Sequence, residues 1–239
     1  MACICVMLYA GFQIYSKTEE DNRGDSAYAD LRQAVARGGP DHAEGGVQAA
    51  PQAEEQQPDI SALRELSGNA VGWIYSEGTP VDYPVVQGTD NSFYLTHLYD
   101  GTKNKVGAIF LDYRNAPDFS DQNSVLYGHH MKSGRMFAEL EKYKKQSYYD
   151  SHPSILLYTQ DGGYRIDLVA GYVVDGSVND LKLNFEGEEL AAFLKEAKGK
   201  STFQSGTAVE KEDRIVTMVT CTYDFANARY ALVGKLVRI

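Results

Sequence analysis

The sequence predicts a mainly β fold, an eight-stranded barrel with helical additions. From Val71 onward the chain consists of short runs rich in β-branched and aromatic residues, separated by turn-forming residues. Many such runs at short spacing are typical of a barrel or a sandwich, and only two helical stretches interrupt them. The chain has 239 residues, of which 43% are hydrophobic, so it accommodates one ordinary domain with appendages.

An apolar run occupies the N-terminal end. Residues 2–15 carry no charge, and an acidic stretch with few Lys or Arg follows them. About 14 residues are too few for a helix to cross a bilayer, which takes roughly 20. The run fits the end of a transmembrane helix, the core of a signal peptide or a buried helix, but it lacks a basic start and a clear cleavage site. We expect a truncated signal-anchor over residues 1–16, and therefore a single-pass protein of the cell membrane with its C-terminal part outside.

Residues 17–58 are expected to form a short helix and a linker. Ser26 is a candidate N-cap for a helix over residues 26–37. One face of this helix carries apolar residues, namely Tyr28, Leu31 and Val35. Residues 41–58 are rich in Ala, Gln, Glu, Gly and Pro and have almost no large apolar side chain, so they predict a flexible linker. Packing against the domain as an ordered strap is the alternative.

Residues 59–239 are expected to form one folded domain. Asp59 is a candidate N-cap for a short helix that ends at Gly68. Further helices are predicted around residues 136–145 and over 187–197, the latter before the penultimate strand. The predicted strands cover residues 73–78, 81–87, 105–114, 123–128, 154–160, 164–174, 214–221 and 229–239.

Composition excludes several classes of function. The formal net charge is −10, which argues against a nucleic-acid-binding protein because such a protein presents a basic face to phosphates. The sequence has no zinc-type Cys/His spacing, no phosphate-binding glycine loop and no internal repeat, so we expect neither metal nor organic cofactor. Cys221 is the only cysteine besides Cys3 and Cys5, which excludes a disulfide framework in the domain. A lone thiol is either a small buried hydrophobe or a reactive group.

Three side chains near strand ends suggest a common site. His129 follows a strand and Gly128, whose backbone freedom allows a tight turn that presents the imidazole at a rim. Cys221 ends a predicted strand, and Arg229 starts the next one after a turn-like segment, so the two should lie at the same end of adjacent antiparallel strands. Each residue alone has a simpler explanation: a loop histidine, a core cysteine and a surface arginine. Their combination favours a reactive site.

Longer segments around these residues resemble class B sortases, from about residue 59 to residue 239. The segments are VGWIYSEGTPVDYPVVQGTDNSFYLTHLYDG, GAIFLDYRN, NSVLYGHHMKSGRMF and VTMVTCTYDFANARYALVGKL. The expected helices at 26–37 and 187–197 are also similar to class B features. The resemblance implies that Cys221 is the nucleophile, His129 its acid/base partner and Arg229 the group that binds the oxyanion. It also implies four substrate-binding residues: Asn91 and Leu95 in DNSFYL, and Tyr127 and Thr220 beside the catalytic pair.

The function implied is that of a membrane-anchored cysteine transpeptidase of Gram-positive bacteria. Such an enzyme cleaves an LPxTG-like C-terminal sorting signal of a surface protein at the Thr carbonyl and forms a thioester. It then transfers the protein to an amine of a cell-wall peptide precursor, without a cofactor. Alternatives are another Cys/His peptidase, an L,D-transpeptidase, or a non-catalytic anchored surface β-domain. The sequence lacks the SxGC-type run of L,D-transpeptidases.

Overall fold

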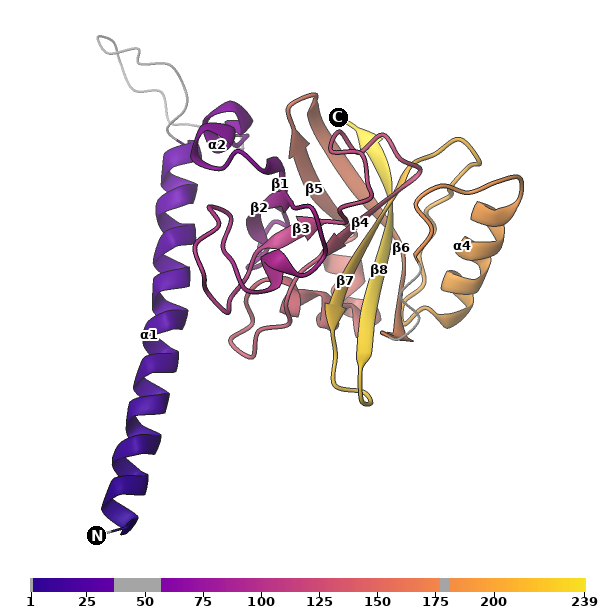
Figure 1. Cartoon of the computed structure of the whole chain (residues 1–239). Coiled ribbons are helices and arrows are strands. Elements are labelled where there is room, and N and C mark those ends of the chain that lie inside the picture. Colours follow the sequence, from indigo (N-terminus) through magenta and orange to yellow (C-terminus); the bar gives the residue numbers. More distant parts are fainter. Residues whose placement is uncertain (1, 37–56, 177–180) are drawn as a thin grey trace, which may run out of the picture.

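The computed structural model describes residues 2–36, 57–176 and 181–239. Its centre is a closed barrel with the strand order β1-β2-β3-β4-β7-β8-β6-β5 (Figure 1). The strands are β1 (Ala70–Tyr75), β2 (Asp82–Gln87), β3 (Ile109–Leu111), β4 (Asn123–Tyr127), β5 (Ser154–Thr159), β6 (Gly162–Asp175), β7 (Ile215–Cys221) and β8 (Ala228–Arg238). The predicted eight-stranded barrel with helical additions is confirmed.

Two of the strand pairs are parallel, β2 with β3 and β4 with β7, and the others are antiparallel. Parallel neighbours cannot be joined by a tight hairpin. Between β4 and β7 the chain therefore passes through β5 and β6 and through three shorter helices. This crossover brings segments about 90 residues apart in sequence side by side, with Tyr127 next to Val219.

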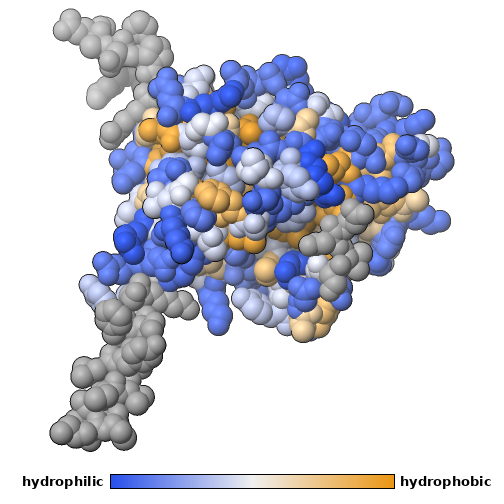
Figure 2. Space-filling view, viewed as in Figure 1, coloured by the Kyte–Doolittle hydropathy of each residue, from blue (hydrophilic) through white to orange (hydrophobic). Residues whose placement is uncertain are grey.

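Alternating side chains fill the barrel. Large apolar residues from all around the sheet meet inside, among them Ile74, Val85, Leu126, Met218 and Leu232, each 0% exposed. Outside the barrel, α4 (Glu189–Lys200) packs Leu190, Leu194 and Ala197 against β6 and β8. All residues of β7 except Cys221 are buried, so this strand is covered on both faces. The face seen in Figure 2 is largely hydrophilic, with smaller apolar patches over the barrel.

Helix α1 (Ala2–Ala36) is much longer than the helix predicted over 26–37. Ser26 lies within it and is not an N-cap, because the charged residues before it continue the helix instead of interrupting it. The predicted apolar face is confirmed, since Tyr28, Leu31 and Val35 are all at most 3% exposed. The Tyr28 hydroxyl donates a hydrogen bond to the Gly107 carbonyl at 2.6 Å, so this end of α1 is fixed to the barrel (Figure 1).

The predicted membrane location is wrong. Within the residues that the structure describes, no helix is both long enough and apolar enough to cross a membrane. The physical reason lies in α1: its uncharged part covers only residues 2–16, and acidic residues follow in the same helix. At about 1.5 Å per residue, some 15 residues measure roughly 22 Å, short of the ~30 Å hydrocarbon layer. The structure therefore does not support the expected single-pass location in the cell membrane. Most of the predicted linker, residues 37–56, lies outside the described residues.

Shorter helices surround the barrel. The predicted cap of α2 (Ile60–Leu66) is confirmed, because the Asp59 carboxylate accepts hydrogen bonds from the amides of Ser61 and Ala62 at 2.9 and 3.0 Å. The last residue of the helix is Leu66 and Ser67 is its C-cap, directly before Gly68, where the helix was expected to end. In place of one helix around 136–145 the chain forms a 3-10 helix, η2 (Phe137–Lys144), and then α3 (Gln146–Ser151). A short 3-10 helix, η1 (Phe93–Leu95), precedes β3.

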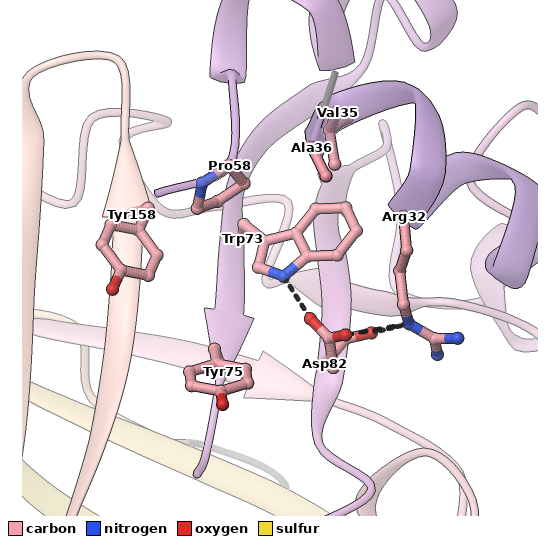
Figure 3. A pocket seen from close by; sticks show the side chains of 8 residues that line it. All are labelled: Arg32, Val35, Ala36, Pro58, Trp73, Tyr75, Asp82 and Tyr158. Carbon is pink, nitrogen blue, oxygen red and sulfur yellow. Dashed lines mark hydrogen bonds and ion pairs between the residues drawn. The ribbon is translucent and has the colours of Figure 1, made fainter. Parts of the chain in front are cut away.

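A cavity of about 260 Å³ lies where the end of α1 meets β1, β2 and β5 (Figure 3). Asp82 organises this junction: it accepts a hydrogen bond from the Trp73 indole at 2.8 Å and pairs with the Arg32 guanidinium at 3.0 Å. In the strand order β1 lies opposite β7. The cavity is therefore remote from Cys221, and its polar contacts serve to attach α1 to the barrel.

Candidate active site

Cys221 and Arg229 are paired on the adjacent strands β7 and β8, and His129 lies two residues beyond the end of the neighbouring strand β4. Strand β4 runs parallel to β7 with Tyr127 beside Val219, and the Gly128 amide extends this ladder by donating to the Val219 carbonyl at 3.2 Å. His129 and Cys221 each follow these partners by two residues, so they are at the same height. In the antiparallel ladder of β7 and β8, Cys221 is paired directly with Arg229. Neighbouring strands are about 4.8 Å apart, so the register brings the three predicted catalytic residues together.

Cys221 faces the outside of the barrel. Its strand alternates, with Met218 in the barrel core and Thr220 only 2% exposed, whereas the Cys221 thiol is free and half-buried. Arg229 is opposite Cys221 in the ladder and therefore projects from the same face. Its guanidinium donates through Nη1 to the Ala228 carbonyl at 3.1 Å. The thiol and the guanidinium are thus presented together at the end of β7 and β8 where a turn connects the two strands.

The His129 side chain rests on the segment before β3. Its Nε2 lies 2.6 Å from the Leu95 carbonyl oxygen. A carbonyl only accepts, so Nε2 carries the proton in this contact. Gly107 lies behind the ring with a φ of +66°, and a Cβ at this position would be 3.0 Å from the His129 ring and 2.6 Å from the Tyr94 carbonyl. Glycine is required here both for the backbone conformation and for the close approach of the imidazole.

A buried carboxylate connects two of the predicted substrate-binding residues. Asp112, 0% exposed, accepts hydrogen bonds from Asn91 at 3.0 Å, from the Tyr127 hydroxyl at 3.2 Å and from the Arg114 guanidinium at 3.0 Å. Burial raises the pKa of Asp112, but the hydrogen bonds from Arg114 and Asn91 outweigh burial and hold the pKa below its usual range. Burial, and secondly the nearby Asp112 charge, raise the pKa of Tyr127. An ionised, buried carboxylate therefore holds Asn91 and Tyr127 in place on the outer surface beside Cys221.

The other two predicted substrate-binding residues differ from each other. Leu95 is 37% exposed at the end of η1, with its carbonyl on His129, so its side chain is open to a ligand. Thr220 is buried, and its hydroxyl has no hydrogen-bond partner within the described residues. Its side chain points into the barrel, which leaves its main chain as the part nearest the Cys221 surface.

Sequence reasoning missed the residues that support the site from behind. Asp112 directly follows the apolar strand β3, and an acid in that position is a recognisable signal. For Gly107 the sequence offered only a glycine near a strand, whose purpose depends on the position of His129. Among the residues described here, no group of three or more His, Cys, Asp or Glu side chains is arranged to hold a metal ion.

Comparison with known proteins agrees with this geometry. The family model described as the sortase domain matches residues 74–237. Sortase B of Listeria monocytogenes is 31% identical over 235 residues, which cover 97% of this chain and 92% of the relative. The chain belongs to the class B sortases. As a sortase it is a cysteine transpeptidase, which confirms the predicted enzyme class and decides against a non-catalytic domain and an L,D-transpeptidase.

Solved sortase structures have the same fold. The Staphylococcus aureus sortase B–substrate complex is 30% identical and has a TM-score of 0.80, over 92% of this chain and 99% of that one. A sortase B complexed with triglycine is 30% identical with a TM-score of 0.78, over 92% of this chain and 99% of that one. The fold shared with these two structures therefore covers 92% of this chain.

Proposed function

We propose that this sortase joins proteins bearing an LPxTG-like C-terminal sorting signal to an amine of a cell-wall peptide, with Cys221 as the nucleophile. The observation that carries the proposal is the row formed by His129, just beyond the end of β4, and the cross-strand pair of Cys221 and Arg229 on β7 and β8. Residues 59–239 contain this row and the surrounding barrel, and we assign them as the catalytic domain. The complexes of two relatives, one with a substrate and one with triglycine, support a peptide substrate and a peptide amine.

The first half-reaction forms a thioester. The thiolate of Cys221, which is the nucleophilic form of the residue, attacks the carbonyl carbon of the Thr in the sorting signal. The C–N bond after this Thr breaks, and the imidazolium of His129 gives a proton to the departing amine. The carboxyl-terminal fragment leaves, and the rest of the substrate remains bound through sulfur.

The second half-reaction reverses the proton transfer. His129, now neutral, removes one proton from the neutral amine of the acceptor peptide as its nitrogen attacks the thioester carbonyl. A new amide bond forms, the C–S bond breaks and the Cys221 thiolate is regenerated. Atoms and charges balance without an oxidant, a metal or an organic cofactor.

Arg229 is proposed to bind the oxyanion in both half-reactions. One N–H group is used by the Ala228 carbonyl, and a guanidinium has five N–H donors, so others remain for the substrate. A preorganised donor at a developing oxyanion contributes about 100- to 1,000-fold to the rate. Gly176 leaves room for the Arg229 side chain beside it, because a Cβ at position 176 would be only 3.1 Å from that side chain.

The sorting signal is proposed to lie over the outer surface between η1 and β7. Leu95 offers exposed apolar area, and Asn91 and Tyr127 border the same surface through their common partner Asp112. Phe110 stacks near Tyr127 with ring centroids 5.4 Å apart, which gives this surface an apolar floor. For Thr220 we propose a contribution through the main chain next to Cys221.

The test is product analysis with a library of sorting-signal peptides and triglycine as acceptor. The full-length protein should cleave one class of peptide after Thr and produce a Thr–triglycine amide, detected by mass spectrometry. Cys221→Ala should give neither product while its circular dichroism spectrum stays native. Transfer by the Cys221→Ala variant would refute the assignment of the nucleophile, and hydrolysis alone, without an amide product, would refute the proposed transfer.

A further inference from the structure

One carboxylate connects the loop after His129 with the turn after Cys221. Glu141, in η2, has its Oε2 2.7 Å from Nε2 of His130, and its Oε1 3.0 Å from the hydroxyl of Thr222. His130 directly follows His129, and Thr222 directly follows Cys221. The two chain segments that present the imidazole and the thiol are therefore bound to the same side chain, although they come from opposite sides of a long crossover.

Lys144 completes this cluster. Its ammonium donates to Glu141 at 2.7 Å, to the Thr222 hydroxyl at 2.9 Å and to Asp224 at 2.6 Å. The hydrogen bonds from Lys144 and Thr222 hold the pKa of Asp224 below its usual range. The hydrogen bond from Lys144 also lowers the pKa of Glu141, with His130 and Thr222 adding to it. Both carboxylates are therefore ionised at neutral pH, and the cluster is an ion pair network, not a set of neutral contacts.

His130 and Thr222 have few other hydrogen-bond partners that could replace Glu141. Nδ1 of His130 is buried and has no hydrogen-bond partner in the part of the chain that the structure describes, so Glu141 is the group that orients this ring. Thr222 is 4% exposed, and its single hydroxyl proton serves either Glu141 or Asp224. Removing the Glu141 carboxylate would break both of its hydrogen bonds to the loop and the turn, and would leave the edge-to-face contact of His130 with Tyr223, with ring centroids 5.2 Å apart, between these two segments.

We propose that Glu141 is a positioning residue for transpeptidation, which sets the separation of the His129 imidazole and the Cys221 sulfur by binding His130 and Thr222 together. This inference rests on the proposed roles of Cys221 and His129. Proton transfer between these groups depends on their alignment, and a misplacement of about 1 Å reduces a rate by up to about 100-fold. The substrate surface over η1 and β3 is held by Asp112 instead, so Glu141 should act on turnover and leave substrate affinity unchanged.

The test compares steady-state kinetics of the full-length protein and Glu141→Ala with a sorting-signal peptide and triglycine. We expect kcat to fall by about 10- to 100-fold while KM for the sorting peptide changes less than about twofold. An unchanged kcat, or a higher KM at constant kcat, would overturn the inference. If the wild-type protein fails to cleave any sorting peptide, the proposed function fails instead, so the two failures are distinguishable.

A matched control and a second variant complete the design. Glu196→Ala removes a similar ion pair, with Lys200 at 2.6 Å, on the exposed side of α4, and it should keep wild-type kcat. An equal loss in both variants would also overturn the inference. Thr222→Val removes the other end of the connection at nearly constant volume, and it decides the question if Glu141→Ala does not fold. It should lower kcat in the same way, and the double variant should lose less than the product of the two effects because both changes break one contact.

Discussion

Cys221 and Arg229 form the last cross-strand pair of β7 and β8, where the two strands separate into their connecting turn. The pair is fixed by a continuous ladder that begins at Ile215 and Lys235, so its geometry depends on strand register and not on loop conformation. A one-residue slip of β8 would move Arg229 to the inner face of the barrel. The position of the proposed oxyanion donor is thus set by the register of β7 and β8.

Arg229→Lys should separate charge from hydrogen-bond geometry. Lysine keeps the positive charge beside Cys221 but lacks the planar fork of the guanidinium. We expect the rate of thioester formation to fall by about 100-fold or more, as for the loss of other oxyanion donors. Single-turnover cleavage of a sorting peptide measures this rate, and a variant within about threefold of wild type would remove Arg229 from the proposed role.

Gly107→Ala should damage both stability and activity. The new Cβ would meet the Tyr94 carbonyl at 2.6 Å and the His129 ring at 3.0 Å, in a backbone with φ of +66°. Gly101→Ala is a matched control, because φ is +82° and a Cβ there meets nothing within 4 Å. The control should lose about 1 kcal/mol of unfolding free energy and keep its kcat. Gly107→Ala should lose more stability and at least about tenfold in kcat; equal behaviour of the two variants in urea denaturation and kinetics would contradict the role of close packing behind His129.

Asp112 should make stability depend on pH in the acid range. Its pKa is lowered in the folded protein, so its ionised form stabilises the fold above the unfolded value of about 3.9, and this contribution is lost as the pH falls through the lower folded value. Asp112→Asn should lower the free energy of unfolding at pH 7 by about 2 kcal/mol, because hydrogen bonds to a buried charged group are lost, while Arg114, whose side chain is 34% exposed, can be solvated instead.

The measurement is the urea midpoint between pH 6 and pH 2.5. The wild-type midpoint should fall more steeply below about pH 4 than that of Asp112→Asn. Asp30→Asn, at an exposed position of α1, should follow the wild-type curve. Parallel curves for wild type and Asp112→Asn would show that this carboxylate is not the source of acid sensitivity.

Tyr28→Phe should test how α1 is attached to the barrel. The variant keeps the buried ring but removes the 2.6 Å hydrogen bond to the Gly107 carbonyl, which is left without this donor. We expect a loss of about 1–2 kcal/mol in unfolding free energy. Chemical denaturation followed by circular dichroism measures it, and an unchanged midpoint would mean that water replaces the hydroxyl at no cost.

Local pattern made most of the fold predictable. The eight strands were recognisable because β-branched runs and turn residues alternate along the chain, and the Asp59 cap was recognisable because its partners are two and three residues away. The length of α1 was not, because charged residues in its middle are as compatible with helix as with a boundary. The 3-10 geometry of η2, where an α-helix was predicted, was not recognisable either, because it depends on packing against β7.

The chemistry-bearing residues were partly accessible in the same way. His129, Cys221 and Arg229 all stand beside strand ends, so the strand pattern already located them. Asp112 and Glu141 acquire their importance from partners that are far away in sequence, such as Asn91 and Thr222. The periodicity of the sequence does not predict these contacts, because they form only when the barrel closes.

The parallel pairing of β4 with β7 has a kinetic consequence. The imidazole and the thiol become neighbours only when β4 pairs with β7, and β5, β6 and α4 lie between these two strands in the sequence. Contacts of such long sequence separation form late and slowly. Recovery of peptide cleavage after dilution from denaturant should therefore lag behind the return of secondary structure. The rate at which enzymatic activity returns would then measure the final step of refolding.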